Sequence, residues 1–271
     1  MLEHRRDTVG YVHKIVRKKK FKRKMKRRTP DGSVTLQRLY MSCREVFKGP
    51  GTVPSPADVQ KLCHILDGVV PEDFGLSRDL QFFQTKAAVK GHPRVAEATI
   101  YSCKNFSLCL FFLPASGVIP LHNHPGMTVF SKLLLGTMHI KAYDWADPLS
   151  SDLAESTSKP NLARLKADSI FTAPCNSSVL YPTSGGNIHE FTAITPCAVL
   201  DVLGPPYSGE DGRDCSFYRD TPCLDLPNGG ERTMAKEEGE RYGWLEEIEM
   251  PEEARMDSIP YLGPQIIETG R

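Results

Sequence analysis

Apolar residues recur with a helical period in one early part of the chain. Between Ser33 and Gly68 they return every three to four residues, as on one face of an amphipathic helix. A first stretch ends at Gly49-Pro50-Gly51, and a second begins at Ser55-Pro56, where a capping serine precedes a proline at the first helical position. The pattern predicts two helices that cover a core rather than carry chemistry.

After about residue 97 the helical period gives way to short β-rich runs separated by Gly, Pro, Asn and Ser. The predicted strands cover 97–103, 107–113, 127–134, 137–144, 161–165, 179–181, 188–194 and 198–203. Gly136-Thr137 stands between two of them, and we expect a hairpin turn there. Many short strands with no helices between them predict an antiparallel sandwich or barrel.

The distribution of charged residues also divides the chain into segments. Residues 1–30 hold 13 Lys and Arg against 2 acidic residues, whereas the rest holds 21 basic and 31 acidic residues. We therefore expect three segments: a basic arm over 1–30, a helical lead-in that packs on the barrel over 31–96, and a β-rich core with an acidic C-terminal segment over 97–271.

The basic arm is too highly charged to pack. Residues 14–28 carry 11 Lys and Arg in 15 positions, and repulsion at that density predicts disorder. Such an arm suits a nuclear-import signal or a non-specific electrostatic contact, and the alternative is a solubilising tail without a partner. We expect a protein of the nucleus and cytoplasm that reads no specific nucleic-acid sequence.

The cysteines and the longest apolar run bear on the redox state of the thiols and on contact with membranes. The eight cysteines form no C-x-x-C pair and no hydrophobic leader precedes them, so we expect reduced thiols. The longest apolar run, 108–113, is far shorter than the roughly 20 residues that cross a bilayer. We expect a monomer without membrane contact.

Two histidines one residue apart form the most informative motif. His122 and His124 lie in "LHNHPGMT", after an apolar run and before a turn. Because residues i and i+2 of a strand point to one face, both rings are expected to enter one cavity and to bind a metal there. The alternative is a pair of exposed or hydrogen-bonded histidines without a ligand.

A third ligand has to come from elsewhere in the chain. His189, in "YPTSGGNIHEFTAI", follows a Gly185-Gly186 turn and is the best candidate, while His139 is its competitor. Imidazole ligands suit iron, zinc and nickel alike, so ligand type does not select the metal.

These motifs resemble the cupin superfamily, in which an H-x-H on one strand and a later His on another bind a metal inside a β-barrel. The implied fold is a mainly β, double-stranded β-helix (jelly-roll barrel) with a short helical lead-in. Typical cupins also place a Glu four or five residues after the second His. Those positions here are Thr128 and Val129, so that carboxylate is missing.

An all-histidine triad resembles the thiol dioxygenases, and three longer segments resemble the plant cysteine oxidase and cysteamine dioxygenase branch. The resemblance covers about residues 35–260. The segments are "LHNHPGMTVFSKLLLGTMHIKAYDW" (121–145), "GGNIHEFTAI" (185–194) and "AVLDVLGPPYS" (198–208). The resemblance implies that His122, His124 and His189 hold Fe(II), and that O2 adds to the sulfur of a protein's N-terminal cysteine.

Two further residues follow from the same resemblance. Asp201 is an acid inside the otherwise apolar "AVLDVLG", and it is expected to receive a substrate ammonium, a His N–H or a buried Arg. A carboxylate satisfied by backbone groups is the alternative. Tyr207, in "GPPYS", is expected near the metal, where its phenol meets O2 or substrate, or else packs as an ordinary aromatic side chain.

In plants the family's substrates are transcription regulators whose oxidised N-termini enter a degradation pathway, so the resemblance also implies an oxygen sensor. Two other functions stay open at this point. One is a dioxygenase for a small free thiol such as cysteamine. The other is a non-catalytic nuclear cupin whose basic arm makes the functional contacts.

Overall fold

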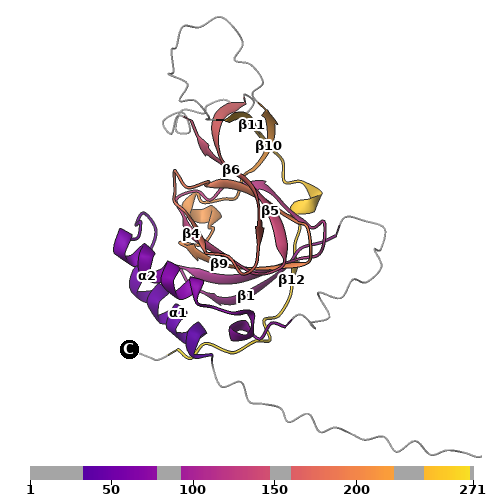
Figure 1. Cartoon of the computed structure of the whole chain (residues 1–271). Coiled ribbons are helices and arrows are strands. Elements are labelled where there is room, and N and C mark those ends of the chain that lie inside the picture. Colours follow the sequence, from indigo (N-terminus) through magenta and orange to yellow (C-terminus); the bar gives the residue numbers. More distant parts are fainter. Residues whose placement is uncertain (1–32, 78–92, 147–159, 223–240, 269–271) are drawn as a thin grey trace, which may run out of the picture.

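We describe the fold from a computed structural model of the chain. The structure describes residues 33–77, 93–146, 160–222 and 241–268. The predicted arm over 1–30, and most of a polar stretch near residue 150, lie outside these residues. Within the described residues two α-helices precede a large assembly of strands (Figure 1).

Both predicted helices are confirmed, and so is the predicted cap of the second. Helix α1 spans Val34–Val46, and the Ser33 side chain accepts a hydrogen bond from the Leu36 amide. Helix α2 spans Pro56–Asp67, begins with the expected proline and is capped by Ser55, which accepts from the Asp58 amide. A short 3-10 turn, η1, follows at Pro71–Phe74. No helix among the described residues is long and apolar enough to span a membrane.

The strands form two sheets that face each other, as expected of a double-stranded β-helix (Figure 1). The first sheet has the order β12 (Asp257–Ser258), β1 (Ala96–Ser102), β2 (Ser107–Leu113), β9 (Cys197–Gly204), β4 (Thr128–Leu135) and β7 (Ser178–Leu180). The second has the order β10 (Phe217–Pro222), β11 (Tyr242–Ile248), β6 (Asn161–Thr172), β5 (Thr137–Trp145), β8 (Ile188–Ala193) and β3 (Val118–His122). It closes on itself, because β10 also pairs with β3.

All eight predicted strands are present, but the prediction was incomplete. Strand β6 runs on to Thr172 because it pairs with β5 from Ala163 to Thr172, although its last residues are exposed and lack an apolar pattern. Strands β3, β10, β11 and β12 were not predicted. Strand β11 lies in the acidic C-terminal segment, where it pairs with β6 and β10 and buries Leu245.

The prediction of a hairpin at Gly136-Thr137 was wrong. Strands β4 and β5 flank this turn but pair with different partners in different sheets, so the chain crosses from one sheet to the other there. Gly136 has φ +92°, and a Cβ at this position would lie 2.3 Å from the Pro196 carbonyl oxygen. Only glycine fits this crossing, which looks like a hairpin turn in the sequence.

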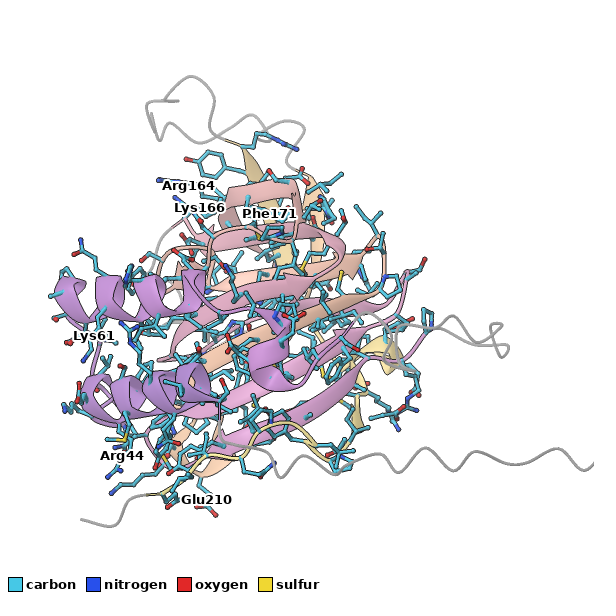
Figure 2. All side chains as sticks on the ribbon, turned by 60° about the horizontal axis from the view of Figure 1, so that its bottom comes forward. Arg44, Lys61, Arg164, Lys166, Phe171 and Glu210 are labelled. Atoms are coloured by element: carbon cyan, nitrogen blue, oxygen red, sulfur yellow. The ribbon has the colours of Figure 1, made fainter. Side chains whose placement is uncertain are left out.

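The helices cover the outer face of the first sheet. In Figure 2 they lie side by side against the strands, and Lys61 of α2 pairs with Glu45 of α1 between them. Phe47, just after α1, packs on β9 where Gly204 leaves room: a Cβ there would lie 2.1 Å from the Phe47 ring. All eight residues of β9 are buried, because helices cover one face and the second sheet the other.

Candidate metal centre and thiol site

The three predicted histidines meet at one end of the space between the sheets. His122 ends β3 and His189 is the second residue of β8, and the two strands pair with these residues opposite each other. One ring nitrogen from each of His122, His124 and His189 lies within 4.8 Å of the others. All three are buried, with exposed fractions of 9%, 2% and 4%. This spacing suits three ligands of one metal ion.

His124 reaches the site by a different route from the one expected. Strand β3 ends at His122, so the two rings do not share a strand face. The turn after β3 brings His124 back, and its ring centroid lies 4.8 Å from that of His122 and 4.7 Å from that of His189. The competitor His139 lies elsewhere and contacts Asp168, with its Nε2 2.8 Å from the carboxylate.

Backbone carbonyls orient the first two rings. Nδ1 of His122 lies 2.8 Å from the Pro120 oxygen, and Nδ1 of His124 lies 2.9 Å from the Asn187 oxygen. Because a carbonyl only accepts, each Nδ1 carries the proton. The Nε2 lone pair of each ring is then left for a metal.

Burial keeps these rings neutral. It lowers the pKa of His122 to about 4 and that of His124 to about 3. Burial, together with the two neighbouring rings, also holds the pKa of His189 well below its usual value. Near neutral pH the site therefore offers three uncharged imidazoles. The carboxylate position of typical cupins is filled by Thr128 and Val129, the latter packed in an apolar cluster.

A cavity of about 310 Å³ opens beside the histidines. Its lining includes the three rings, both other predicted site residues, Asp201 and Tyr207, and Cys215. No lysine or arginine is among the described residues that line it. The structure thus brings all five predicted site residues to one cavity, and their roles remain predictions.

Asp201 lies in the middle of β9 with an exposed fraction of 5%. The Ser131 hydroxyl hydrogen-bonds the carboxylate, but the Oδ1 atom is buried and has no hydrogen-bond partner among the residues that the structure describes. Burial raises the pKa of Asp201 to about 7, and the nearby Glu97 carboxylate adds to this rise. A buried carboxylate with a free oxygen in a cavity is a natural binding site for a cation.

The Tyr207 hydroxyl donates a hydrogen bond to the Asn123 carbonyl oxygen at 2.8 Å, between the two ligands of the H-x-H motif. Its ring lies 5.7 Å from the His124 ring. Burial raises the pKa of Tyr207 well above its usual value, and the Cys215 thiol hydrogen-bonds the same hydroxyl. In this structure Tyr207 therefore holds the ligand-bearing segment with its only donated proton.

Sequence reasoning missed three polar residues around the site. Asn187 contacts His124, Asp144 contacts the turn before His189, and Glu97 lines the cavity. The alternation in β1, where Ala96 and Ala98 face the helices, could have placed Glu97 on the cavity side. Nothing local marks Asn187 or Asp144, because the partner of Asn187 lies 63 positions away and that of Asp144 lies 42 positions away.

With this geometry established, comparison with known proteins identifies the family. The profile of the PCO_ADO family matches residues 65–266. Plant cysteine oxidase 1 of Arabidopsis thaliana is 47% identical over 243 residues, which cover 87% of this chain and 82% of the relative. The chain belongs to the PCO_ADO family.

Further PCO_ADO relatives agree. Plant cysteine oxidase 2 of Arabidopsis thaliana is 48% identical over 236 residues, covering 86% of this chain and 83% of the relative. The 2-aminoethanethiol dioxygenase of Mus musculus is 31% identical over 254 residues, covering 86% of this chain and 96% of the relative. The plant cysteine oxidases and the 2-aminoethanethiol dioxygenase are thiol dioxygenases. This chain is a thiol dioxygenase of the same family.

Proposed function

We propose that this protein is an iron-dependent dioxygenase that adds both atoms of O2 to the sulfur of an N-terminal cysteine in a protein substrate. One observation carries the proposal: Asp201, a buried carboxylate with one oxygen that has no hydrogen-bond partner among the described residues, lines the same cavity as three neutral histidines. An N-terminal cysteine presents a thiol and an ammonium three bonds apart. The histidine site suits the thiol and Asp201 suits the ammonium.

The three imidazoles fit Fe(II), although ligand type alone suits Zn(II) or Ni(II) as well. Bound there, iron(II) supplies the Lewis acidity that favours a thiolate and the redox activity that O2 requires. The reaction converts the thiolate and O2 into a sulfinate, with two new S–O bonds and four electrons from sulfur. No reducing co-substrate is therefore needed.

The residues of the chain bind and orient the substrate. Carbonyl groups of Pro120 and Asn187 fix two histidine rings. Asp201 would accept the substrate ammonium through the oxygen that has no hydrogen-bond partner among the described residues. Tyr207 fixes the segment between His122 and His124 by its bond to Asn123. Held this way, sulfur and O2 react at a high effective concentration.

The lining of the cavity bears on the choice of thiol. Free cysteine carries a carboxylate that would need a cation, and no lysine or arginine is among the described lining residues. A peptide lacks that carboxylate next to its cysteine, which favours a protein N-terminus. Cysteamine lacks it too and carries the same ammonium, so cysteamine is the second candidate substrate.

The biological role extends the same proposal. The protein substrates would be transcription regulators whose oxidised N-termini lead to their degradation, so the reaction would report oxygen. Residues 1–30 would place the enzyme in the nucleus as well as the cytoplasm. Deleting them should move a fluorescently tagged protein out of the nucleus without lowering the kcat/KM of the purified enzyme.

The decisive experiment is aerobic incubation of the Fe(II)-loaded protein with a peptide that begins with cysteine, followed by mass spectrometry. We expect a gain of two oxygen atoms on this peptide and none on its N-acetylated twin, and His189→Ala should abolish the gain. Oxidation of cysteamine alone would replace the proposal by the small-thiol enzyme. No oxidation by metal-replete protein would favour a non-catalytic cupin.

A further inference from the structure

Asp144 is a buried acid that the proposed reaction does not use. It lies near the end of β5 with an exposed fraction of 8%. Its carboxylate accepts three hydrogen bonds from consecutive amides: Gly185 to Oδ2 at 3.0 Å, Gly186 to Oδ1 at 2.8 Å and Asn187 to Oδ1 at 3.0 Å. One side chain thus holds the whole turn that leads into β8.

The turn is shaped for this contact. Gly185 and Gly186 have φ values of +82° and +84°, which other L-residues rarely adopt. A Cβ on Gly186 would lie 2.8 Å from the Ala142 side chain, so the turn lies directly against β5. The close approach brings three amide N–H groups within reach of the Asp144 carboxylate.

The same turn leads directly to the His189 ligand. His189 is the second residue of β8 and lies two positions after Asn187. The Asn187 N–H, at the end of the turn, points to Asp144. The Asp144 carboxylate therefore fixes the backbone that carries His189.

Asn187 extends the contact to the His124 ligand. Its carbonyl oxygen lies 2.9 Å from Nδ1 of the His124 ring. Its side-chain amide bonds the His124 backbone on both sides, accepting from the amide at 3.1 Å and donating to the carbonyl at 2.9 Å. A third bond, to the Tyr181 carbonyl at 2.7 Å, anchors this amide. Two of the three histidines thus depend on the turn that Asp144 holds.

We propose that Asp144 is a positioning residue for the metal centre, acting on His189 through the turn over residues 185–187 and on His124 through Asn187. This inference rests on the metal site of the proposed function. Metal-binding histidines usually donate their second ring N–H to a carboxylate or carbonyl, and removing such partners weakens metal binding. Here one carboxylate holds the turn that supplies the Asn187 carbonyl to His124 and leads directly to His189.

The test is metal affinity, which requires no substrate. We would titrate Asp144→Asn and the wild-type protein anaerobically with Fe(II) against a competing chelator, and record the Co(II) absorption spectrum of each. Asparagine keeps the size of the side chain but turns an NH2 group toward the Gly185 amide. We expect Fe(II) binding about 10- to 100-fold weaker and a shifted Co(II) spectrum.

Asp220→Asn is the matched control. Asp220 is a partly buried acid of the second sheet that bonds Lys141 and the Tyr143 hydroxyl and contacts none of the histidines in the described structure. It should leave Fe(II) affinity and the Co(II) spectrum unchanged. A role of Asp144 in stability alone would lower the melting temperature but leave the affinity of the folded protein within twofold of wild type, and that would overturn the inference.

A second variant covers the case in which Asp144→Asn does not fold. Asn187→Ala removes the side-chain bonds to His124 but keeps the backbone contacts, and it should also bind Fe(II) about tenfold more weakly. Wild-type affinity in Asn187→Ala would overturn the inference. A wild-type protein that binds Fe(II) but leaves the cysteine peptide unoxidised would instead overturn the proposed function alone.

Discussion

Asp201 is a buried acid that lines the cavity, where we propose that it accepts the substrate ammonium. We predict that Asp201→Asn lowers kcat/KM for a peptide with a free N-terminal cysteine by about 30-fold or more, because a buried ion pair that loses one partner costs about 2–5 kcal/mol. Kinetics on the free-amine peptide measure this, with Asp220→Asn as the control. Equal kcat/KM in Asp201→Asn and wild type would refute the role of Asp201.

The same residue predicts an unusual dependence of stability on pH. Burial raises its pKa from 3.8 to about 7, so between these values the folded metal-free protein holds a proton that the unfolded chain has released. Its contribution to stability is therefore lost as pH rises toward 7 and beyond.

Asp201→Asn removes this dependence. From pH 5 to pH 8, its free energy of unfolding should rise by about 2–3 kcal/mol relative to that of the wild type. Urea unfolding of both metal-free proteins at the two pH values measures the difference. The same difference at both pH values would show that Asp201 is not buried as a neutral acid.

At the scale of elements, pairing between β3 and β8 positions the ligands, while the helices support the sheet from outside. Opposed residues His122 and His189 come from neighbouring strands, whereas α2 contacts the far side of the first sheet through Leu62, Ile65 and Leu66. Stability changes in α2 should therefore leave the geometry of the site intact.

The cap of α2 gives a direct test. Ser55→Ala removes the acceptor for the Asp58 amide and should lower the free energy of unfolding by about 1 kcal/mol, with kcat/KM unchanged. Ser169→Ala, at an exposed position of β6, should change stability by less than about 0.5 kcal/mol. Urea unfolding compares the two variants, and equal effects would argue against a capping role for Ser55.

At the scale of the whole molecule, the chain builds the site by crossing repeatedly between two sheets. The second sheet closes on itself when β10 and β11 fold over its outer face, and Tyr143, Ala163 and Leu245 form the small core beneath them. This architecture also brings together the partners of two side-chain hydrogen bonds at the site: Gly186 and Asp144 are 42 positions apart, and His124 and Asn187 are 63 positions apart.

The crossing at Gly136 tests this architecture. Gly136→Ala should lower the free energy of unfolding by about 3 kcal/mol or more, because the new methyl group would meet the Pro196 carbonyl and the Cys197 sulfur. Gly51→Ala is the matched control, since Gly51 also has a positive φ, +77°, but open space around it. Its cost should be about 1–2 kcal/mol of backbone strain. Similar losses of unfolding free energy in both variants would contradict the close contact of Gly136 with Pro196 and Cys197.

Local signals in the sequence were enough to predict many of the helices and strands of this protein. Two helices and eight strands follow from apolar periodicity, and the cap of α2 follows from the Ser55-Pro56 pair, because burial of one face and orphan amides at helix ends are local requirements. The H-x-H pair and His189 follow from residue type and from the resemblance to a family whose ligands occur at matching positions.

Tertiary structure alone decided the rest. Whether Gly136 makes a hairpin or a crossing depends on which strands β4 and β5 pair with, and local apolar period does not specify the partner. Asn187 hydrogen-bonds His124, and Asp144 hydrogen-bonds the glycine turn. Both contacts join residues that are distant in the chain. Such contacts form only when strand register and sheet closure bring these segments together, because a hydrogen bond needs an approach to about 3 Å that periodicity cannot encode.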